Sequence, residues 1–173
     1  MTLYAVTNPA TGKVEKTFPT KSNEEVQGAI ALAHRAYKGW RNGSVKERAE
    51  LLGRVAELYI KHRDKLASII SREMGKPLYQ AGIELDIVVS IYRYYADNGP
   101  SYLEAEPIEI VTGGSAVIHK EGLGVLLGIM PWNYPYYQVA RFVAPNLMNG
   151  NTILLKHAPQ CPESALAIEQ IFK

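Results

Sequence analysis

The sequence predicts an α/β protein in which a helical segment precedes the first part of a parallel βαβα sheet, with a β-hairpin arm between them. Between residues 22 and 98, apolar side chains recur at helical intervals. From residue 124 the pattern changes, and two short apolar runs alternate with two helical segments. The connections are short enough for a right-handed parallel crossover. We therefore expect an incomplete parallel sheet within the 173 residues.

The composition excludes several classes of protein. Hydrophobic residues make up 47% and charged residues 21%, which is typical of a folded globular chain. The net charge is +2 and no long run of Lys and Arg occurs, so we expect no nucleic acid partner. No apolar run reaches the roughly 18 residues of a membrane span, and we expect a cytoplasmic protein without a membrane partner. The single cysteine allows no intrachain disulfide and no multi-cysteine metal site, and we predict no metal.

The chain opens with a predicted hairpin. Short β-type segments at Leu3–Val6 and Val14–Phe18 are joined through Asn8-Pro9-Ala10-Thr11-Gly12. Asn, Pro and Gly in this order are typical of a tight turn. The two segments should therefore pair as antiparallel strands.

Three helices are predicted next, over 22–40, 44–75 and 78–98. Ser22 and Glu25 have the spacing of a capping box, the second helix starts with the same signal, and a Gly-Pro pair ends the third. The residues expected to face the core are Val26, Ile30, Ala33 and Tyr37, then Leu52, Val55, Tyr59, Leu66 and Ile70, and finally Ile83, Ile87, Ser90, Ile91 and Tyr94.

A second hairpin and the sheet complete the chain. Strands at Ile108–Val111 and Ser115–His119 flank Thr112-Gly113-Gly114, a turn sequence. The sheet segment then follows in the order strand, helix, strand, helix, at 125–130, 136–148, 152–155 and 162–172.

The loop from Met130 to Pro135 is the first candidate site. It follows a buried strand, at the edge where open α/β sheets bind their ligands. Its two prolines restrict the backbone around Asn133, and an amide held in one place can act as an oxyanion donor. The residues support an alternative equally well, in which Asn133 caps the next helix and Trp132 fills the core.

Lys156 ends the second predicted strand and is the other candidate. At this edge its ammonium group could donate to ribose hydroxyls or to a phosphate, although most lysines are solvated surface charges. The usual Gly-x-Gly-x-x-Gly fingerprint is absent, because Gly122, Gly124 and Gly128 precede the first strand or lie within it.

Taken together, these segments resemble the aldehyde dehydrogenase superfamily. The resemblance covers nearly the whole chain, and its most specific part is the Pro-Trp-Asn-Tyr-Pro loop followed by Gly-Asn-Thr and a lysine. The matching segments are Asn8 to Gly12, the helix end at Trp40, Glu73 to Leu78 with Glu84, Gly124-Val125, Pro131 to Pro135, Asn149 to Thr152, and Leu155-Lys156. Lys156-His157-Ala158-Pro159 and Cys161-Pro162 are most similar to the bacterial succinate-semialdehyde dehydrogenase branch.

The resemblance implies the N-terminal part of the aldehyde dehydrogenase fold. Residues 1–105 would form the N-terminal hairpin and helices of the cofactor-binding domain, 106–121 an oligomerisation-type β-hairpin arm, and 122–173 the first half of a Rossmann-like NAD(P)-binding sheet. The arm implies that the full-length enzyme is a homo-oligomer, either a dimer or a tetramer.

The resemblance also implies an activity, the oxidation of a small aldehyde to the carboxylic acid with NAD or NADP, with succinic semialdehyde as the expected substrate. Asn133 would be the catalytic oxyanion donor, and Lys156 would bind the adenosine ribose. The nicotinamide side would be lined by Ile129, Met130, Pro131 and Trp132. Pro159 stands where the family usually carries a glutamate that helps to choose between NAD and NADP.

The family reaction uses a cysteine nucleophile, a general base and a Gly-rich pyrophosphate turn. The resemblance places all three beyond Lys173, so we expect the 173 residues to be inactive alone. An alternative is a truncated remnant that binds nucleotide weakly or pairs with full-length subunits. A third, less favoured interpretation uses Cys161, because a helix N-terminus can lower the pKa of a thiol. The simpler interpretation is a small residue at a helix start.

Overall fold

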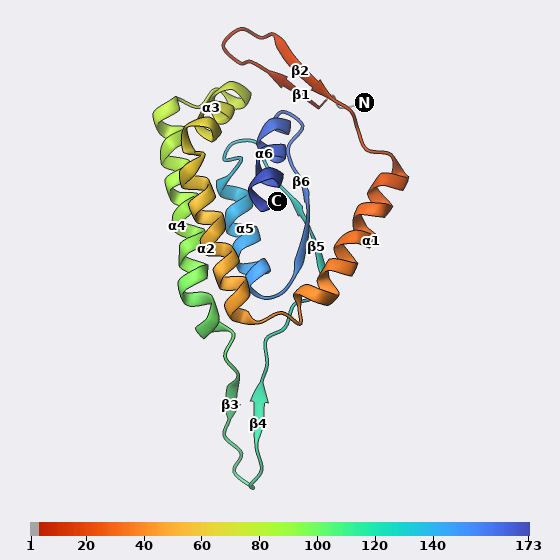
Figure 1. Ribbon diagram of the computed structural model, residues 1–173, viewed down its shortest axis with the longest axis vertical. Coiled ribbons are helices and arrows are strands. Elements are labelled where there is room, and N and C mark those ends of the chain that lie inside the picture. Colours follow the sequence, from red (N-terminus) through yellow and green to blue (C-terminus); the bar gives the residue numbers. More distant parts are fainter. Residues whose placement is uncertain (1–3) are drawn as a thin grey trace.

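A computed structural model describes residues 4–173. The helices and strands, in chain order, are β1 (Tyr4–Thr7), β2 (Val14–Phe18), α1 (Asn23–Trp40), α2 (Val45–Lys61), α3 (Arg63–Met74), α4 (Leu78–Tyr102), β3 (Glu106–Ile108), β4 (Ala116–Ile118), β5 (Val125–Ile129), α5 (Tyr137–Met148), β6 (Thr152–Lys156) and α6 (Pro162–Phe172). Figure 1 shows β5 and β6 between α1 on one side and the other helices on the other, with the β3–β4 arm projecting at one end. The predicted α/β organisation is confirmed.

The N-terminal hairpin forms as predicted. Strands β1 and β2 pair antiparallel with Tyr4 opposite Phe18, and Leu3 lies outside the described residues. In the turn, Asn8 Oδ1 accepts from the Ala10 N–H at 3.0 Å, and Gly12 takes a left-handed φ of 68°. That conformation favours glycine because it has no Cβ to clash.

The capping boxes predicted from sequence are present in the structure. Ser22 and Glu25 exchange side-chain and backbone bonds at the start of α1, and Ser44 and Glu47 do the same for α2. These bonds satisfy N–H groups that have no partner inside the helix.

The predicted second helix is wrong in one respect, because it is two helices. His62, with φ −106° and ψ 11°, interrupts the helical backbone between α2 and α3. The five residues from Lys61 to Lys65 are all polar, and the bend lets the apolar residues of both helices face α4. Gly75, with φ 75°, ends α3.

Helix α4 differs from the prediction in its length and in its buried face. It continues past Pro100 to Tyr102. At Gly99 it packs so closely on α5 that an added Cβ would lie 2.5 Å from Met148 Cγ, which accounts for the glycine. The predicted core residues Ile83, Ile87, Ser90 and Tyr94 are exposed and Ile91 is half-buried; the residues that face α2 and α5 are Ala81, Leu85, Val88 and Tyr92. The helix is apolar on two sides, so contact with its neighbours decides which side is buried.

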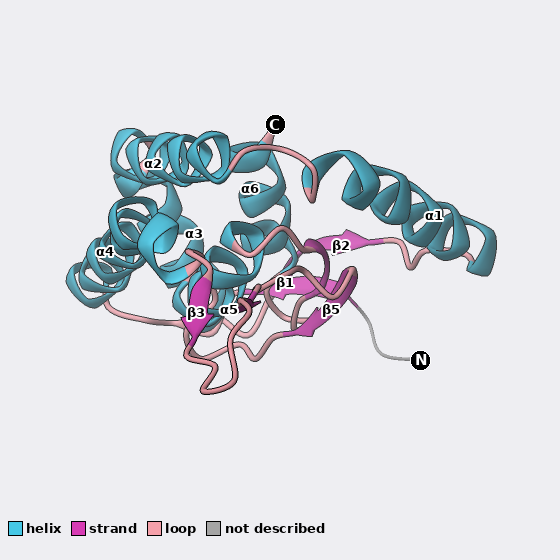
Figure 2. Cartoon of the chain, turned by 90° about the horizontal axis from the view of Figure 1, so that it is seen from below, coloured by secondary structure: helices cyan, strands magenta, loops and turns pink. Residues whose placement is uncertain are grey.

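Helix α1 is also less buried than predicted. Val26 and Ile30 are exposed, Ala33 is half-buried, and Tyr37 is buried and donates from its hydroxyl to Gly122 O at 2.7 Å. The helix lies against β5 and β6. Figure 2 shows it apart from the other helices. The two strands cover only a small part of the apolar face of α1, so Val26 and Ile30 stay exposed.

The sheet segment matches its prediction. Strands β5 and β6 pair in parallel, with Val125 opposite Thr152 and Ile129 opposite Lys156. The arm also forms, but its first strand is shifted: β3 ends at Ile108, where the prediction began. The turn is wider than predicted because residues 109–115 all lie in it, including the positive-φ glycines Gly113 and Gly114.

The hydrophobic core lies among α2 to α6. Its largest buried side chains include Tyr59, Tyr92 and Tyr136. The Tyr59 ring stacks on the Tyr92 ring with 5.6 Å between ring centres, and it meets the Tyr136 ring edge-on with 6.0 Å between ring centres. Between residues 4 and 173, no helix combines the length and the apolar character needed to cross a membrane.

Candidate active-site edge

The parallel register brings two predicted site residues together at the carboxyl edge of the sheet. Ile129 ends β5 opposite Lys156 at the end of β6, and the Met130 N–H donates to Lys156 O at 3.0 Å. Ile129 is 70% exposed and Lys156 is also exposed, with its Nζ 5.4 Å from the centre of the Tyr4 ring. An open apolar surface and a cation therefore lie side by side at this edge.

The backbone of the following loop is held by three side chains. Cys161 Sγ contacts Trp132 O at 3.8 Å, Lys76 Nζ donates to Asn133 O at 3.0 Å, and His157 Nε2 bonds Pro135 O at 2.9 Å. The carbonyls of Trp132, Asn133 and Pro135 each have a partner from another part of the chain. The loop is therefore fixed by its backbone, in addition to the restriction from its prolines.

The Asn133 side chain is left exposed by these contacts, and its amide makes no hydrogen bond to any residue in the 4–173 range. The alternative in which Asn133 caps the next helix is wrong, because the N-cap of α5 is Tyr136 and no cap side chain bonds there. Trp132 is 49% exposed and does not fill the core. The geometry leaves the Asn133 amide available to a ligand.

Glu84 supplies the cap that Asn133 does not. Its Oε1 accepts from the N–H groups of Tyr136 and Tyr137 at 2.9 and 3.2 Å, and its Oε2 pairs with Lys76. A carboxylate at a helix N-terminus is stabilised by the orphan N–H groups and by the helix dipole. No role is predicted for Glu84 from the sequence. The sequence feature that could have indicated this role is the position of Glu84, an acidic residue beside Leu85 and Val88 on an apolar helix face.

Glu73 acts in the same way on α6. It accepts from the N–H groups of Glu163 and Ser164 and from the Ser164 hydroxyl, at 2.6, 3.0 and 2.6 Å. Burial raises the pKa of Glu73 to about 7, although the bonds from Ser164 oppose that shift. Two buried glutamates therefore anchor the helices that follow β5 and β6.

His157 is a tether. Its Nδ1 accepts from the Ala158 N–H at 2.8 Å, so the Nε2 carries the proton donated to Pro135 O. Burial lowers the pKa of His157, which favours this neutral form. Both ring nitrogens are engaged, and neither is available as a general base.

Pro159, the predicted cofactor-selecting position, is half-buried in the loop after β6. Its carbonyl accepts from the Ala5 N–H at 3.2 Å, which joins the loop to β1. The position carries no charge that could attract or repel a ligand.

The less favoured interpretation, in which the helix N-terminus lowers the pKa of the Cys161 thiol, is wrong. Cys161 does occupy the N-cap position of α6, but it is fully buried. Burial, and to a lesser degree the carboxylates of Glu73 and Glu84, raises the pKa of its thiol to about 12. Almost no thiolate exists at neutral pH, so this thiol is a poor nucleophile.

Cys161 is therefore expected to resist alkylation. In the native protein at pH 7.5, iodoacetamide should label the peptide that contains Cys161 about 10³-fold more slowly than in the same protein unfolded in urea, because the thiol pKa falls back toward about 8.5 on unfolding. Mass spectrometry of the digested protein measures both rates. Similar rates in the two states would restore Cys161 as a reactive thiol.

Arg141 is an exposed cation near the loop and is not among the site residues predicted from the sequence. Its guanidinium lies 5.6 Å from the Tyr137 ring, and Tyr137 meets Tyr134 edge-on at 5.7 Å. The Gln138 N–H donates to Tyr134 O, so the helical turn already begins beside Asn133. The spacing of Tyr134, Tyr137 and Arg141 places all three on one helix face and was the available signal.

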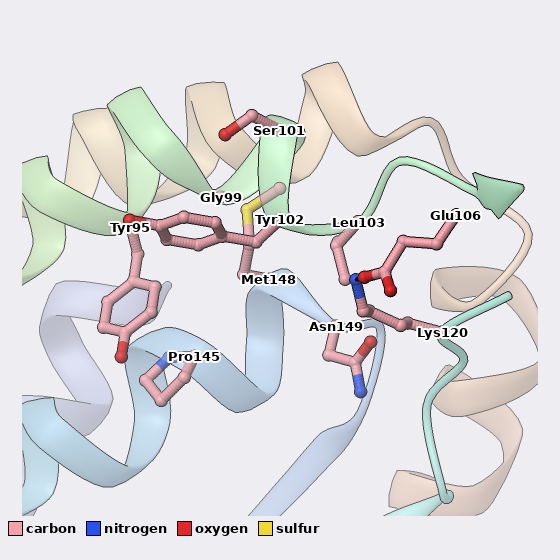
Figure 3. A pocket seen from close by; sticks show the side chains of 10 residues that line it. All are labelled: Tyr95, Gly99, Ser101, Tyr102, Leu103, Glu106, Lys120, Pro145, Met148 and Asn149. Atoms are coloured by element: carbon pink, nitrogen blue, oxygen red, sulfur yellow. Dashed lines mark hydrogen bonds and ion pairs between the residues drawn. The ribbon is translucent and has the colours of Figure 1, made fainter. Parts of the chain in front are cut away.

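A cavity of about 550 Å³ lies elsewhere, where the C-terminal ends of α4 and α5 meet the base of the arm. Figure 3 shows Tyr95, Tyr102, Met148 and Lys120 around it. No predicted site residue lines this cavity. The candidate site is therefore an open edge and loop.

The model of the family described as "Aldehyde dehydrogenase family" matches residues 1–173. The chain belongs to the aldehyde dehydrogenase family. The family predicted from the sequence motifs is thereby confirmed.

Relatives within the aldehyde dehydrogenase family can be named. The succinate-semialdehyde dehydrogenase [NADP(+)] of Deinococcus radiodurans is 51% identical over 169 residues, covering 98% of this chain and 35% of the relative. The crystal structure of succinic semialdehyde dehydrogenase from Streptococcus pyogenes with NADP+ superposes with a TM-score of 0.94 at 38% identity, covering 98% of this chain and 37% of that one.

A more distant member gives the same fold. A point mutant of betaine aldehyde dehydrogenase from Staphylococcus aureus, solved with NAD+, has a TM-score of 0.91 at 25% identity, covering 98% of this chain and 34% of the other. The fold class predicted here, the N-terminal part of the aldehyde dehydrogenase fold, is confirmed. The chain spans about a third of the length of these relatives.

Proposed function

We propose that this chain contributes the cofactor edge and the oxyanion donor of an NADP-dependent succinate-semialdehyde dehydrogenase, which oxidises succinic semialdehyde to succinate. One observation carries the proposal. The Asn133 carbonyl is held by a hydrogen bond from Lys76, whereas the Asn133 side-chain amide is exposed, in the loop that follows the sheet edge where Lys156 lies. The names of the relatives supply the substrate and cofactor.

The residues at this edge fit a nicotinamide dinucleotide, which when bound supplies the hydride acceptor. Lys156 would donate to the adenosine ribose, and the segment of Ile129, Met130, Pro131 and Trp132 would line the nicotinamide side. Pro159 supports NADP over NAD, because a carboxylate at that position would repel a 2′-phosphate and proline does not.

Asn133 would act on the substrate carbonyl. As the aldehyde carbon is attacked, its oxygen becomes negative, and the amide N–H, already in position, donates to it without reorganisation. Arg141 would pair with the carboxylate at the other end of the substrate, because it is an exposed cation on the helix face that begins beside Asn133.

We infer that the 173 residues do not complete this reaction on their own. A covalent mechanism needs an accessible thiolate. The one cysteine of the sequence is Cys161, which is buried and has a raised pKa. The nucleophile would therefore come from another segment of the protein.

The test uses the protein produced from its native gene, whose intact mass is measured first. With succinic semialdehyde and NADP+, we expect the absorbance of the reduced cofactor to rise, faster than with NAD+, and the expressed 173-residue segment should give no turnover. A native protein that folds but reduces neither cofactor with any aldehyde would overturn the proposal in favour of a remnant that only binds nucleotide.

Replacing Lys156 by alanine is expected to raise the KM for NADP+ about 10-fold, since it removes a charge-assisted hydrogen bond to the cofactor. The KM for the aldehyde should change little. Lys46→Ala is the matched control, because the Lys46 side chain is 85% exposed at the start of α2. Steady-state kinetics with varied cofactor measure the effect, and an unchanged KM for NADP+ would remove the ribose assignment.

The arm is proposed to join copies of the protein in a homo-oligomer, a dimer or a tetramer. Ile108, Val111, Val117 and Ile118 are exposed on and around its strands, and exposed apolar side chains that gather in one place favour a protein–protein contact. The division at 1–105, 106–121 and 122–173 and the cytoplasmic location stay predictions.

A further inference from the structure

Lys76 lies in the turn between α3 and α4, and its ammonium group is buried. Only 8% of the residue is exposed. Its Nζ pairs with Glu84, donates to Asn133 O at 3.0 Å and lies 3.6 Å from the centre of the Tyr134 ring. A buried cation is costly unless it is paired and hydrogen-bonded. The contacts that stabilise Lys76 include the backbone of Asn133.

Glu84 connects Lys76 to the other side of the loop. This carboxylate is 1% exposed, and while one oxygen binds Lys76 the other accepts from the N–H groups of Tyr136 and Tyr137. The pair therefore holds the chain on both sides of the short Tyr134-Pro135 segment. Any ligand oxygen bound by the Asn133 amide would lie beside a backbone that this ion pair fixes.

The Lys76–Glu84 pair differs from the other side chains that hold the loop in the carbonyl that it binds. His157 and Cys161 bind the carbonyls of Pro135 and Trp132, whereas Lys76 binds the carbonyl of Asn133 itself. Because the carbonyl and the side chain share one Cα, fixing the carbonyl limits the directions in which the amide can point. A displacement of about 1 Å in a catalytic group can cost about 10²-fold in rate.

We infer that Lys76 and Glu84 are positioning residues, a buried ion pair that aims the Asn133 amide at the reacting oxygen by holding the Asn133 carbonyl and the start of α5. This inference rests on the proposed function. The pair does not touch the substrate. Its loss should therefore lower kcat and leave the KM for the aldehyde nearly unchanged, because aim matters most when the oxygen carries charge.

The main variant removes both charges together, since removal of one would leave the other buried and unpaired. In the protein from its native gene, Lys76→Met with Glu84→Gln should lower kcat about 10-fold, a smaller loss than that expected when the amide itself is deleted. The matched control is Arg63→Met. It breaks the exposed Arg63–Asp86 ion pair, which joins α3 to α4, and should leave kcat unchanged.

A double-mutant cycle separates positioning from a structural effect. If the pair acts through Asn133, the same double substitution should cost little further kcat in an Asn133→Ala background. An equal loss of kcat in both backgrounds would overturn the inference. A normal kcat for the double variant in the wild-type background would do the same.

Two further outcomes are separable. If the doubly substituted protein does not fold, Lys76→Arg becomes the test: it keeps a buried cation but cannot place a single nitrogen in the same way, and kcat should again fall with KM little changed. Failure of Lys76→Arg to fold, or a normal kcat in it, would assign the pair to folding alone. If Asn133→Ala itself leaves turnover unchanged, the proposed function fails, whatever the result for Lys76.

Discussion

Asn133→Ala is expected to lower kcat for succinic semialdehyde about 10²-fold or more. The amide is exposed, and its backbone is held through Lys76, so it can donate to a developing negative charge with no cost of reorganisation. Removing one such donor typically costs about 10²- to 10³-fold in kcat. The KM should change less, because the uncharged carbonyl of the bound aldehyde accepts a weaker hydrogen bond than the charged oxygen does.

Asn42→Ala is a suitable control for this experiment. Asn42 is also exposed, but its amide donates to Lys38 O at the end of α1, far along the chain from the loop. Steady-state kinetics should show wild-type turnover in Asn42→Ala, and circular dichroism should show that both variants are folded. Turnover in Asn133→Ala within a factor of two of wild type would remove the oxyanion role.

The local structure could be predicted because its causes are local. A capping box uses residues three apart, as at Ser22 and Glu25, and the parallel pairing of β5 with β6 follows from two short apolar runs separated by a helical segment. The break at His62 and the buried side of α4 have no local cause. They depend on which faces α2, α4 and α5 present to one another, and α4 carries apolar residues on both sides.

The candidate site could also be predicted only in part, because some of its contacts join residues far apart in the chain. The loop of Asn133 and the position of Lys156 at a sheet edge followed from strand ends, which the sequence indicates. The side chains that hold the loop did not. Lys76 lies 57 residues before Asn133 and Glu84 lies 52 residues before Tyr136, and the packing of α4 on α5 brings Glu84 to the start of α5, beside the loop.

Arg141→Met is expected to lower kcat/KM for succinic semialdehyde by about 10- to 100-fold, mainly through a higher KM. A hydrogen bond to a charged group is worth about 1.5–3 kcal/mol, which corresponds to that range. The guanidinium lies over the Tyr137 ring, on the helix whose first turn begins beside Asn133, and this is the position proposed to meet the carboxylate while the aldehyde end stays near Asn133. Methionine keeps much of the side-chain volume and removes the charge together with the N–H donors.

Butanal provides the control substrate, because it has the same chain length as succinic semialdehyde and no carboxylate. Its kcat/KM should be unchanged or slightly improved in Arg141→Met, since the loss of a cation matters only to an anionic substrate. The ratio of the two kcat/KM values therefore isolates the charge contribution from any general damage to α5. If both substrates lose equally, Arg141 supports the helix, and a different cation must select the carboxylate. Lys76 cannot take that part, because Glu84 already neutralises it within the buried pair.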